Sequence, residues 1–417
     1  MPSFAARGAD GMDFDDTRVE AEFRASVRAF LTRHSKLKDG SATAHAMSHE
    51  ARSEAETEHV REAQAWQACL FDNGWAGITW PGEYGGRGGT IVEQMIFNQE
   101  LSHYDVPGSV FAQGIGMAGP TLIRHGTPEQ KGRFLGPMLR GDELWCQLFS
   151  EPGAGSDLAA LSTRAIRDGE EFVVTGQKVW TSSAHYSDWG ILLARTDTNV
   201  PKHQGITYFL VDMSTPGIDV RPLRQITGTA HFNEVFLTDV RIPISQVVGE
   251  INRGWGVTMT TLTSERTLIG GGSADPMGGL LRLVERHGDA GDPVLRQALA
   301  DVYIRHQLIK FLGWRVQSAI SRGASPGPES SILKLAHTVA LTKVTNLALA
   351  ISGASGTLIH EHDPDGRAAA FGFLSQFASK IGGGTDEVQR NIVGERVLGL
   401  PGDVRVDKDL PFRDLPR

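Results

Sequence analysis

The chain of 417 residues has few cysteines and few aromatic residues, and it lacks any long uninterrupted apolar segment. The two cysteines, Cys69 and Cys146, form neither a metal-binding nor a redox-active pattern, so we expect no metal ion and a cytoplasmic location. No stretch approaches the roughly 18 consecutive apolar residues of a membrane-spanning helix, so we expect no membrane span. The first residues also lack a basic segment followed by an apolar core, which argues against a secretory signal.

Basic residues are outnumbered as well. The 41 lysines and arginines stand against 49 aspartates and glutamates, and the formal net charge is −8. This balance argues against a dedicated nucleic-acid-binding protein. The remaining composition, with 40% hydrophobic and 22% charged residues, is that of an ordinary globular protein. The length allows two or three domains and a large core.

The periodicity of apolar residues predicts a chain of three domains. The spacing is helical at first, then alternates as in strands, and then becomes helical again. We therefore predict an α+β, mainly helical fold, in which a middle β domain shaped as a small barrel or sandwich separates a helical domain from a four-helix bundle. The predicted boundaries are residues 1–145, 146–245 and 246–417.

Individual elements can be predicted within these domains. Thr127 followed by Pro128 is typical of a helix start. Residues 171–180 read as a β-hairpin that turns at Thr175-Gly176-Gln177. After the β domain, Trp255, Met259 and Leu262 recur along one face of a predicted helix.

Residues 146–182 contain the pattern most typical of a cofactor site. The segment from Ser150 to Asp157 combines hydroxyls with glycines, and such a loop exposes backbone N–H groups to an anion or a carbonyl oxygen. Trp180-Thr181-Ser182 places an indole beside hydroxyls, which suits a flat aromatic ligand with polar edges. An ordinary glycine-rich turn and a core tryptophan are the alternatives for each motif alone. Together, the two motifs predict a flavin site at the edge of the β domain.

Five motifs follow one another in an order and at a spacing that resemble one flavoprotein family. They are Gly74-Trp75 with Trp80-Pro81, Ser150 to Asp157, Gly176-Gln177-Lys178 with Trp180-Thr181-Ser182, Phe232-Asn233-Glu234-Val235, and Gly384 to Arg390. From roughly residue 20 to residue 402 the chain resembles the acyl-CoA dehydrogenases. Within that family, the position of the residue that would act as catalytic base resembles the isovaleryl-CoA and long-chain branches. The resemblance implies bound FAD, an acyl-CoA substrate, and an electron-transferring flavoprotein as acceptor. It also implies a homotetramer, with a dimer or a heterotetramer containing a related subunit as alternatives.

The same resemblance implies which residues form the site. The implied FAD contacts are Gln147, Phe149, Ser150, Gly155, Ser156, Trp180, Thr181, Ser182, Arg286, Gly353, Thr385 and Glu387. The implied substrate contacts are Ser156, Ser264, Arg266, Gly383 and Gly384. Thr385 also reads as a helix N-cap, which is compatible with a place in the site. The family's Arg-x-Thr-Phe-Gly and Gln-x-x-Gly-Gly-x-Gly elements are incomplete around Arg286 and Gly353, and both elements belong to the cross-subunit part of the FAD site.

Removal of an α-proton from a thioester needs a positioned base and stabilisation of the enolate oxygen. Many members of the family carry a glutamate as this base just before the Gly-Thr-rich turn, and in this chain Gly383 stands at that position. Glu265, on the first long helix after the β domain, is predicted to replace it, although Glu265-Arg266 could also form a solvated helix face. Gly270 to Gly272 and Pro276 predict a kink or break in this helix. The small residues at 382 and 383 predict space for a branched, cyclic or bulky acyl group.

Three functions are compatible with the sequence. The first is FAD-dependent α,β-dehydrogenation of an acyl-CoA thioester to the 2-enoyl-CoA. The second is oxidase or monooxygenase chemistry in the same flavin pocket. The third is a poorly active partner subunit of a heteromeric acyl-CoA dehydrogenase.

Overall fold

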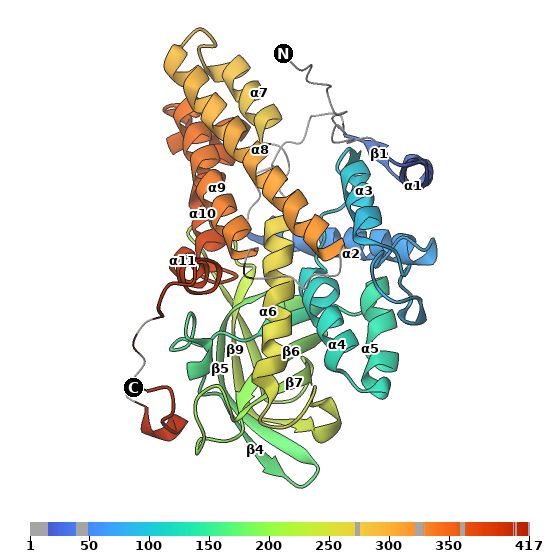
Figure 1. Ribbon diagram of the computed structural model, residues 1–417, viewed down its shortest axis with the longest axis vertical. Helices are drawn as coiled ribbons and strands as arrows, with labels where there is room; N and C mark the ends of the chain where they lie inside the picture. The colour runs from blue at the N-terminus through green and yellow to red at the C-terminus, as the bar shows by residue number, and fades with distance from the viewer. Residues whose placement is uncertain are drawn as a thin grey trace, which may run out of the picture.

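The computed structural model describes residues 16–38, 49–271, 276–321, 328, 330–358, 363–402, 404 and 407–415. Its three parts are N-terminal helices, a central curled β-sheet and a C-terminal group of helices (Figure 1). The predicted α+β, mainly helical fold is confirmed. Helix α6 (Gly254–Gly271) runs from the β-sheet toward the C-terminal helices and so connects these two parts (Figure 1).

The N-terminal part consists of helices, three of which begin at capping boxes. The helices are α1 (Arg18–His34), α2 (His49–Asp72), α3 (Ile91–Leu101), α4 (Gly119–His125) and α5 (Pro128–Arg140), with a two-stranded pair of β1 (Lys36–Leu37) and β2 (Tyr104–Asp105). The side chains of Thr17, Thr90 and Thr127 each accept a hydrogen bond from the first helical turn and form capping boxes. The predicted start of α5 at Thr127-Pro128 is confirmed.

The central sheet has seven strands and forms the core of the middle region. The strands are β3 (Trp145–Leu148), β4 (Arg164–Asp168), β5 (Glu171–Ser182), β6 (Trp189–Arg195), β7 (Ile206–Asp212), β8 (Ile218–Leu223) and β9 (Phe232–Pro243). Their order is β3-β6-β4-β5-β9-β8, and β7 pairs with β6. β3 and β4 run parallel to β6, and the other pairs are antiparallel. β6 and β7 are buried along almost their whole length, as their continuous apolar sequences require.

The predicted hairpin at Thr175-Gly176-Gln177 is wrong. β5 continues through these residues, and the turn lies earlier, at Gly169, where φ is +61°. Gly176 is needed for a different reason: a Cβ atom there would collide with the side chain of Thr163. A glycine that allows close packing therefore looks like a turn glycine in the sequence.

The C-terminal part is a helical bundle around α9. Its further helices are α7 (Met277–His287), α8 (Pro293–Ser321), α9 (Ser330–Ser352), α10 (Pro364–Ile381) and α11 (Asp386–Ile392). α9 packs against α6, α7, α8, α10 and α11. Among the described helices, only α9 is long and apolar enough to cross a membrane, but Lys334 and Thr338 on it are fully buried against the start of α11.

Candidate active site

The loop from Ser150 to Asp157 follows β3 and lies beside β5. The N–H of Val179 donates to the carbonyl oxygen of Ser150 at 2.9 Å, which joins this loop to the strand of Trp180. Within the described part of the chain, the backbone N–H groups of Gly155 and Ser156 make no hydrogen bond. A Cβ atom at Gly155 would meet no other atom within 4 Å. The loop therefore presents unpaired donors on an open side.

A buried ion pair holds the other side of this loop. Lys178 is completely buried, and its Nζ donates to Glu151 Oε1 at 2.8 Å and to the carbonyl of Phe149 at 3.0 Å. Glu151 also accepts from the N–H groups of Ser162 and Thr163 at 2.7 and 2.9 Å. Burial lowers the pKa of Lys178, and the charge of Glu151 opposes this effect. Lys178, Ser162 and Thr163 all bind the Glu151 carboxylate, so this end of the loop is anchored.

The Glu151 carboxylate makes the stability of this region depend on pH. Burial alone would raise the pKa of Glu151, but Lys178 and the hydrogen bonds from Thr163 and Ser162 together lower it from 4.5 to about 2. Between these values the unfolded chain binds a proton that the folded chain does not bind, so stability falls as the pH falls. We expect a loss of about 2 kcal/mol by pH 3 from this group.

Urea unfolding at pH 6 and pH 3 measures this loss. In Glu151→Gln the side chain no longer titrates, so the difference in unfolding free energy between the two pH values should be smaller than in the wild type by about 2 kcal/mol. Equal differences in the two proteins would contradict the assignment.

Trp180 occupies an irregular position of β5. The pairing of β5 with β9 shifts between Lys178 and Thr181, and Trp180 has φ of +61°, which is uncommon for a residue other than glycine. Trp180 is 61% exposed, and its indole meets the Phe232 ring edge-on at 6.0 Å between centroids. The bulge therefore turns a large apolar ring outward beside the glycine-rich loop.

The other predicted residues of β3 and β5 divide between the two faces of the sheet. Ser182 and Gln147 are half-buried, whereas Thr181 is completely buried with no hydrogen-bond partner for Oγ1 in the described structure. The Phe149 ring is also buried, edge-on to Tyr208 at 5.9 Å. The structure thus places Ser182 near the open side with Trp180, and it places the side chains of Thr181 and Phe149 in the interior.

Helix α6 carries Glu265 on a face that begins with threonines. Thr258 and Thr261 are completely buried, and the Thr261 hydroxyl hydrogen bonds with Thr121 of α4 at 2.8 Å and with Tyr208 of β7 at 3.1 Å. Glu265 lies four residues after Thr261, hence one turn further along the same face, and it is half-buried. The predicted face of Trp255, Met259 and Leu262 is only partly buried, and the fully buried side chains of α6 are Val257 and the two threonines.

The neighbouring substrate residues predicted on α6 are described less completely. Ser264 is half-buried, and the side chain of Arg266 lies outside the described residues. Helix α6 is continuous through Gly270 and Gly271. Residues 272–275, where part of the predicted break falls, lie outside the described residues.

The turn between α10 and α11 contains Gly383 and Gly384, and hydrogen bonds fix its carbonyl groups. Lys334 Nζ, fully buried on α9, donates to the Gly384 carbonyl at 2.7 Å, and Gln389 Nε2 donates to the Gly383 carbonyl at 2.9 Å. Both glycines have positive φ, +66° and +87°. A glutamate at 383 would need a left-handed backbone, which costs roughly 1–2 kcal/mol.

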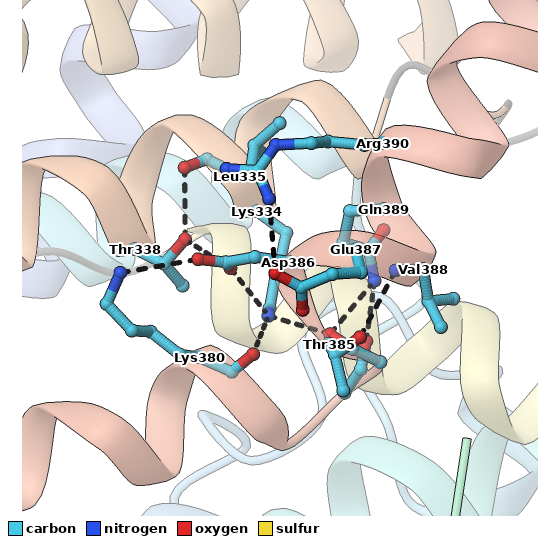
Figure 2. A network of polar contacts seen from close by, with 12 residues as sticks. Lys334, Leu335, Thr338, Lys380, Thr385, Asp386, Glu387, Val388, Gln389 and Arg390 are labelled. Atoms are coloured by element: carbon cyan, nitrogen blue, oxygen red, sulfur yellow. Dashed lines mark hydrogen bonds and ion pairs between the residues drawn. The ribbon is translucent and has the colours of Figure 1, made fainter.

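An acidic residue completes this network (Figure 2). Asp386, at the start of α11, accepts from the Thr338 hydroxyl at 2.7 Å and lies 3.4 Å from Lys380 Nζ and 3.5 Å from Lys334 Nζ. Burial alone would raise the pKa of Asp386, but Thr338 and the two lysines together lower it. α9 thus has two neighbours of interest. It packs against α6, and through Lys334 it holds the Gly383-Gly384 turn, which the sequence predicts to lie near the substrate.

The four remaining predicted FAD contacts do not meet the glycine-rich loop within the described chain. Thr385 caps α11, since its Oγ1 accepts from the Val388 N–H at 3.1 Å, and the exposed Glu387 pairs with Arg390 at 3.3 Å. Arg286 on α7 binds Asp365 at 2.8 Å. Gly353 follows α9 in the same end of the bundle, where the Ser355 carbonyl lies against Gly366.

Sequence reasoning missed the residues that fix the two loops. Glu151, Lys178 and Lys334 are charged residues in buried positions, and their partners are distant in the sequence or in another element. The signal for Lys178 was present, because it occupies a position of β5 that alternation directs inward. The signal for Lys334 is that it follows apolar residues in a helix with very few charges, a position that also indicates burial.

Models of acyl-CoA dehydrogenase domains match most of the chain. The N-terminal domain matches residues 17–142, the middle domain matches 146–240, and the C-terminal domain matches 252–398. These three matches follow the three parts of the structure.

Individual proteins agree with the domain matches. Acyl-CoA dehydrogenase FadE34 of Mycobacterium tuberculosis is 43% identical over 338 residues, which are 80% of this chain and 46% of FadE34, so the match spans about half of that protein. Acyl-CoA dehydrogenase IpdE1 of the same species is 38% identical over 92% of this chain and 98% of IpdE1. The solved Tcur3481-Tcur3483 steroid ACAD superimposes with a TM-score of 0.78 at 31% identity, covering 94% of this chain and all of that one. The chain belongs to the acyl-CoA dehydrogenase family of flavoprotein oxidoreductases.

Proposed function

We propose that this protein is an FAD-dependent acyl-CoA dehydrogenase that forms a 2-enoyl-CoA and uses Glu265 as the base for the α-proton. The observation that carries the proposal is the position of Glu265 on the buried threonine face of α6, one turn beyond the contact of Thr261 with Thr121 and Tyr208. A glutamate on a solvated face would be exposed, whereas Glu265 is half-buried. α6 also packs against α9, which holds the Gly383-Gly384 turn.

The residues around the glycine-rich loop fit FAD. The unpaired N–H groups of Gly155 and Ser156 suit the pyrophosphate, and the exposed indole of Trp180 with the hydroxyl of Ser182 suits the isoalloxazine ring. When bound, FAD supplies the acceptor for the hydride from the β-carbon. The protein supplies the carboxylate that takes the α-proton and the fixed loops that orient the thioester.

We propose a branched, cyclic or otherwise bulky acyl group as substrate. Gly382 and Gly383 carry no side chains where the turn follows α10, and the similarity to a protein described as a steroid ACAD supports a large substrate. Titration of the flavin with branched, cyclic and straight-chain acyl-CoA thioesters tests this choice. Preferential bleaching by medium straight chains would contradict it.

A variant can test whether this turn sets the specificity. Gly382 has φ of −64°, so a side chain there causes no left-handed strain, and its Cβ would meet only the Ala378 carbonyl at 3.2 Å. We expect Gly382→Leu to lower kcat/KM for bulky acyl groups roughly tenfold while changing it little for short ones. An equal loss for both classes would show a general disturbance instead of selection by size.

We propose an electron-transferring flavoprotein as acceptor, a cytoplasmic location and a homotetramer. A heterotetramer is the alternative, because Arg286 already pairs with Asp365 and the elements for a neighbouring subunit's FAD are incomplete. The absorption spectrum of the purified single chain distinguishes the two: stoichiometric flavin bleached by acyl-CoA supports the homomeric enzyme, and a colourless protein supports a partner subunit. Oxygen consumption without an electron-transferring flavoprotein would instead support oxidase chemistry.

A further inference from the structure

The C-terminal segment 407–415 lies beyond the matched family domains, which end at residue 398, and it returns to the β domain. Figure 1 shows this segment, in red, beside the β domain. It binds the turn between β6 and β7: the N–H of Phe412 donates to the Val200 carbonyl at 2.9 Å, and the N–H of Arg413 donates to the Thr198 carbonyl at 3.1 Å. Arg413 also donates to Asn199 Oδ1 at 2.7 Å.

Two cations connect this segment to the glycine-rich loop. Lys202 lies between two carboxylates, with its Nζ 2.7 Å from Asp157 and 3.5 Å from Asp407. Arg195 is 3% exposed, and the Phe412 ring covers its guanidinium at 3.9 Å from the ring centroid.

The Arg195 guanidinium in turn fixes the chain just after the glycine-rich loop. Its Nη2 donates to the carbonyls of Ala159 and Leu161 at 2.6 and 3.3 Å, and its Nη1 donates to the carbonyls of Lys202 and Gln204, both at 2.8 Å. Its Nε has no hydrogen-bond partner in the described structure.

We propose that segment 407–415 is a positioning element for the cofactor loop, which keeps the N–H groups of Gly155 and Ser156 aligned by anchoring Asp157 and the carbonyls of residues 159–161. This inference rests on the proposed FAD site. Lys178 anchors the Glu151 end of the loop. At the far end, Lys202 binds Asp157 and Arg195 binds the carbonyls of residues 159 and 161, while Leu158 and Leu161 pack in the core. Removal of the ring or of the Asp407 carboxylate loosens that far end without touching the loop itself.

The test uses the full chain, Phe412→Ala, Asp407→Asn, a truncation after Gly402, and the control Lys408→Ala, whose side chain is exposed. FAD affinity is measured by titration of the apoprotein, and hydrogen exchange is measured over residues 150–163 with and without FAD. We expect the dissociation constant for FAD to rise about tenfold in Phe412→Ala and in the truncated chain, with a smaller rise in Asp407→Asn. Exchange at 153–161 should accelerate in these variants and stay unchanged in Lys408→Ala.

The outcomes separate this inference from the proposed function. Wild-type FAD binding with unchanged affinity and exchange in Phe412→Ala would overturn the positioning role and leave the proposed function intact. A wild-type chain that binds no FAD would contradict the proposed function, and the exchange rates without FAD would then decide whether the segment anchors the loop. If the truncated chain does not fold, the two point variants give the decision.

Discussion

Replacement of Glu265 by glutamine should reduce the rate of flavin reduction by acyl-CoA by roughly 100- to 10,000-fold, the range typical for loss of a general base. Glutamine has nearly the same size but cannot accept the α-proton. The buried contacts of Thr261 with Thr121 and Tyr208 lie one turn away and are unchanged, so folding and FAD binding should be retained. Stopped-flow measurement of flavin bleaching under single-turnover conditions reports this step directly.

Glu285→Gln is a matched control for this experiment. Glu285 lies on α7, is exposed, and undergoes the same chemical change. Its variant should reduce the flavin at the wild-type rate. A Glu265→Gln variant with near-normal reduction would refute the assignment of the base, whereas a variant that loses FAD would show that Glu265 supports the cofactor site instead.

Replacement of Lys178 by methionine should destabilise the fold by about 3–5 kcal/mol, because it leaves the Glu151 carboxylate buried without its cation. Lys178 is completely buried and Glu151 is 6% exposed, so water cannot replace the lost partner. The Phe149 carbonyl loses a donor as well. Because these groups hold the glycine-rich loop, FAD affinity should fall together with stability. Urea unfolding gives the free energy, and FAD titration gives the affinity.

Arg241→Met provides the comparison for an exposed ion pair. Arg241 is paired with Asp168 and Glu171 at 3.1 and 3.0 Å, but all three side chains are well exposed. Exposed pairs contribute at most about 1 kcal/mol, so this variant should unfold almost like the wild type. A Lys178→Met variant that is no less stable than Arg241→Met would contradict the proposed role of the buried pair. The double variant Glu151→Gln with Lys178→Met should recover part of the loss, since no unpaired charge remains.

The candidate site was predictable to the extent that local patterns define it. The glycine-rich loop and Trp180-Thr181-Ser182 were placed side by side from sequence, and the bond between Val179 and Ser150 joins them. The threonine cap of α11 was also readable, because capping depends on residues three positions apart. The role of Gly176 was not, because the atoms that exclude a side chain there belong to Thr163 on another segment.

The sequence by itself determined the order of helical and strand regions, the helix caps and the family, since these depend on spacing along the chain. The tertiary structure decided which of the predicted side chains are buried, which are exposed and which partners they have. It buried Thr181 while exposing Trp180, paired Lys178 with Glu151, and set Phe412 over Arg195. The physical reason is that the energy of a buried charge or ring depends on partners far away in the chain, which no local pattern records.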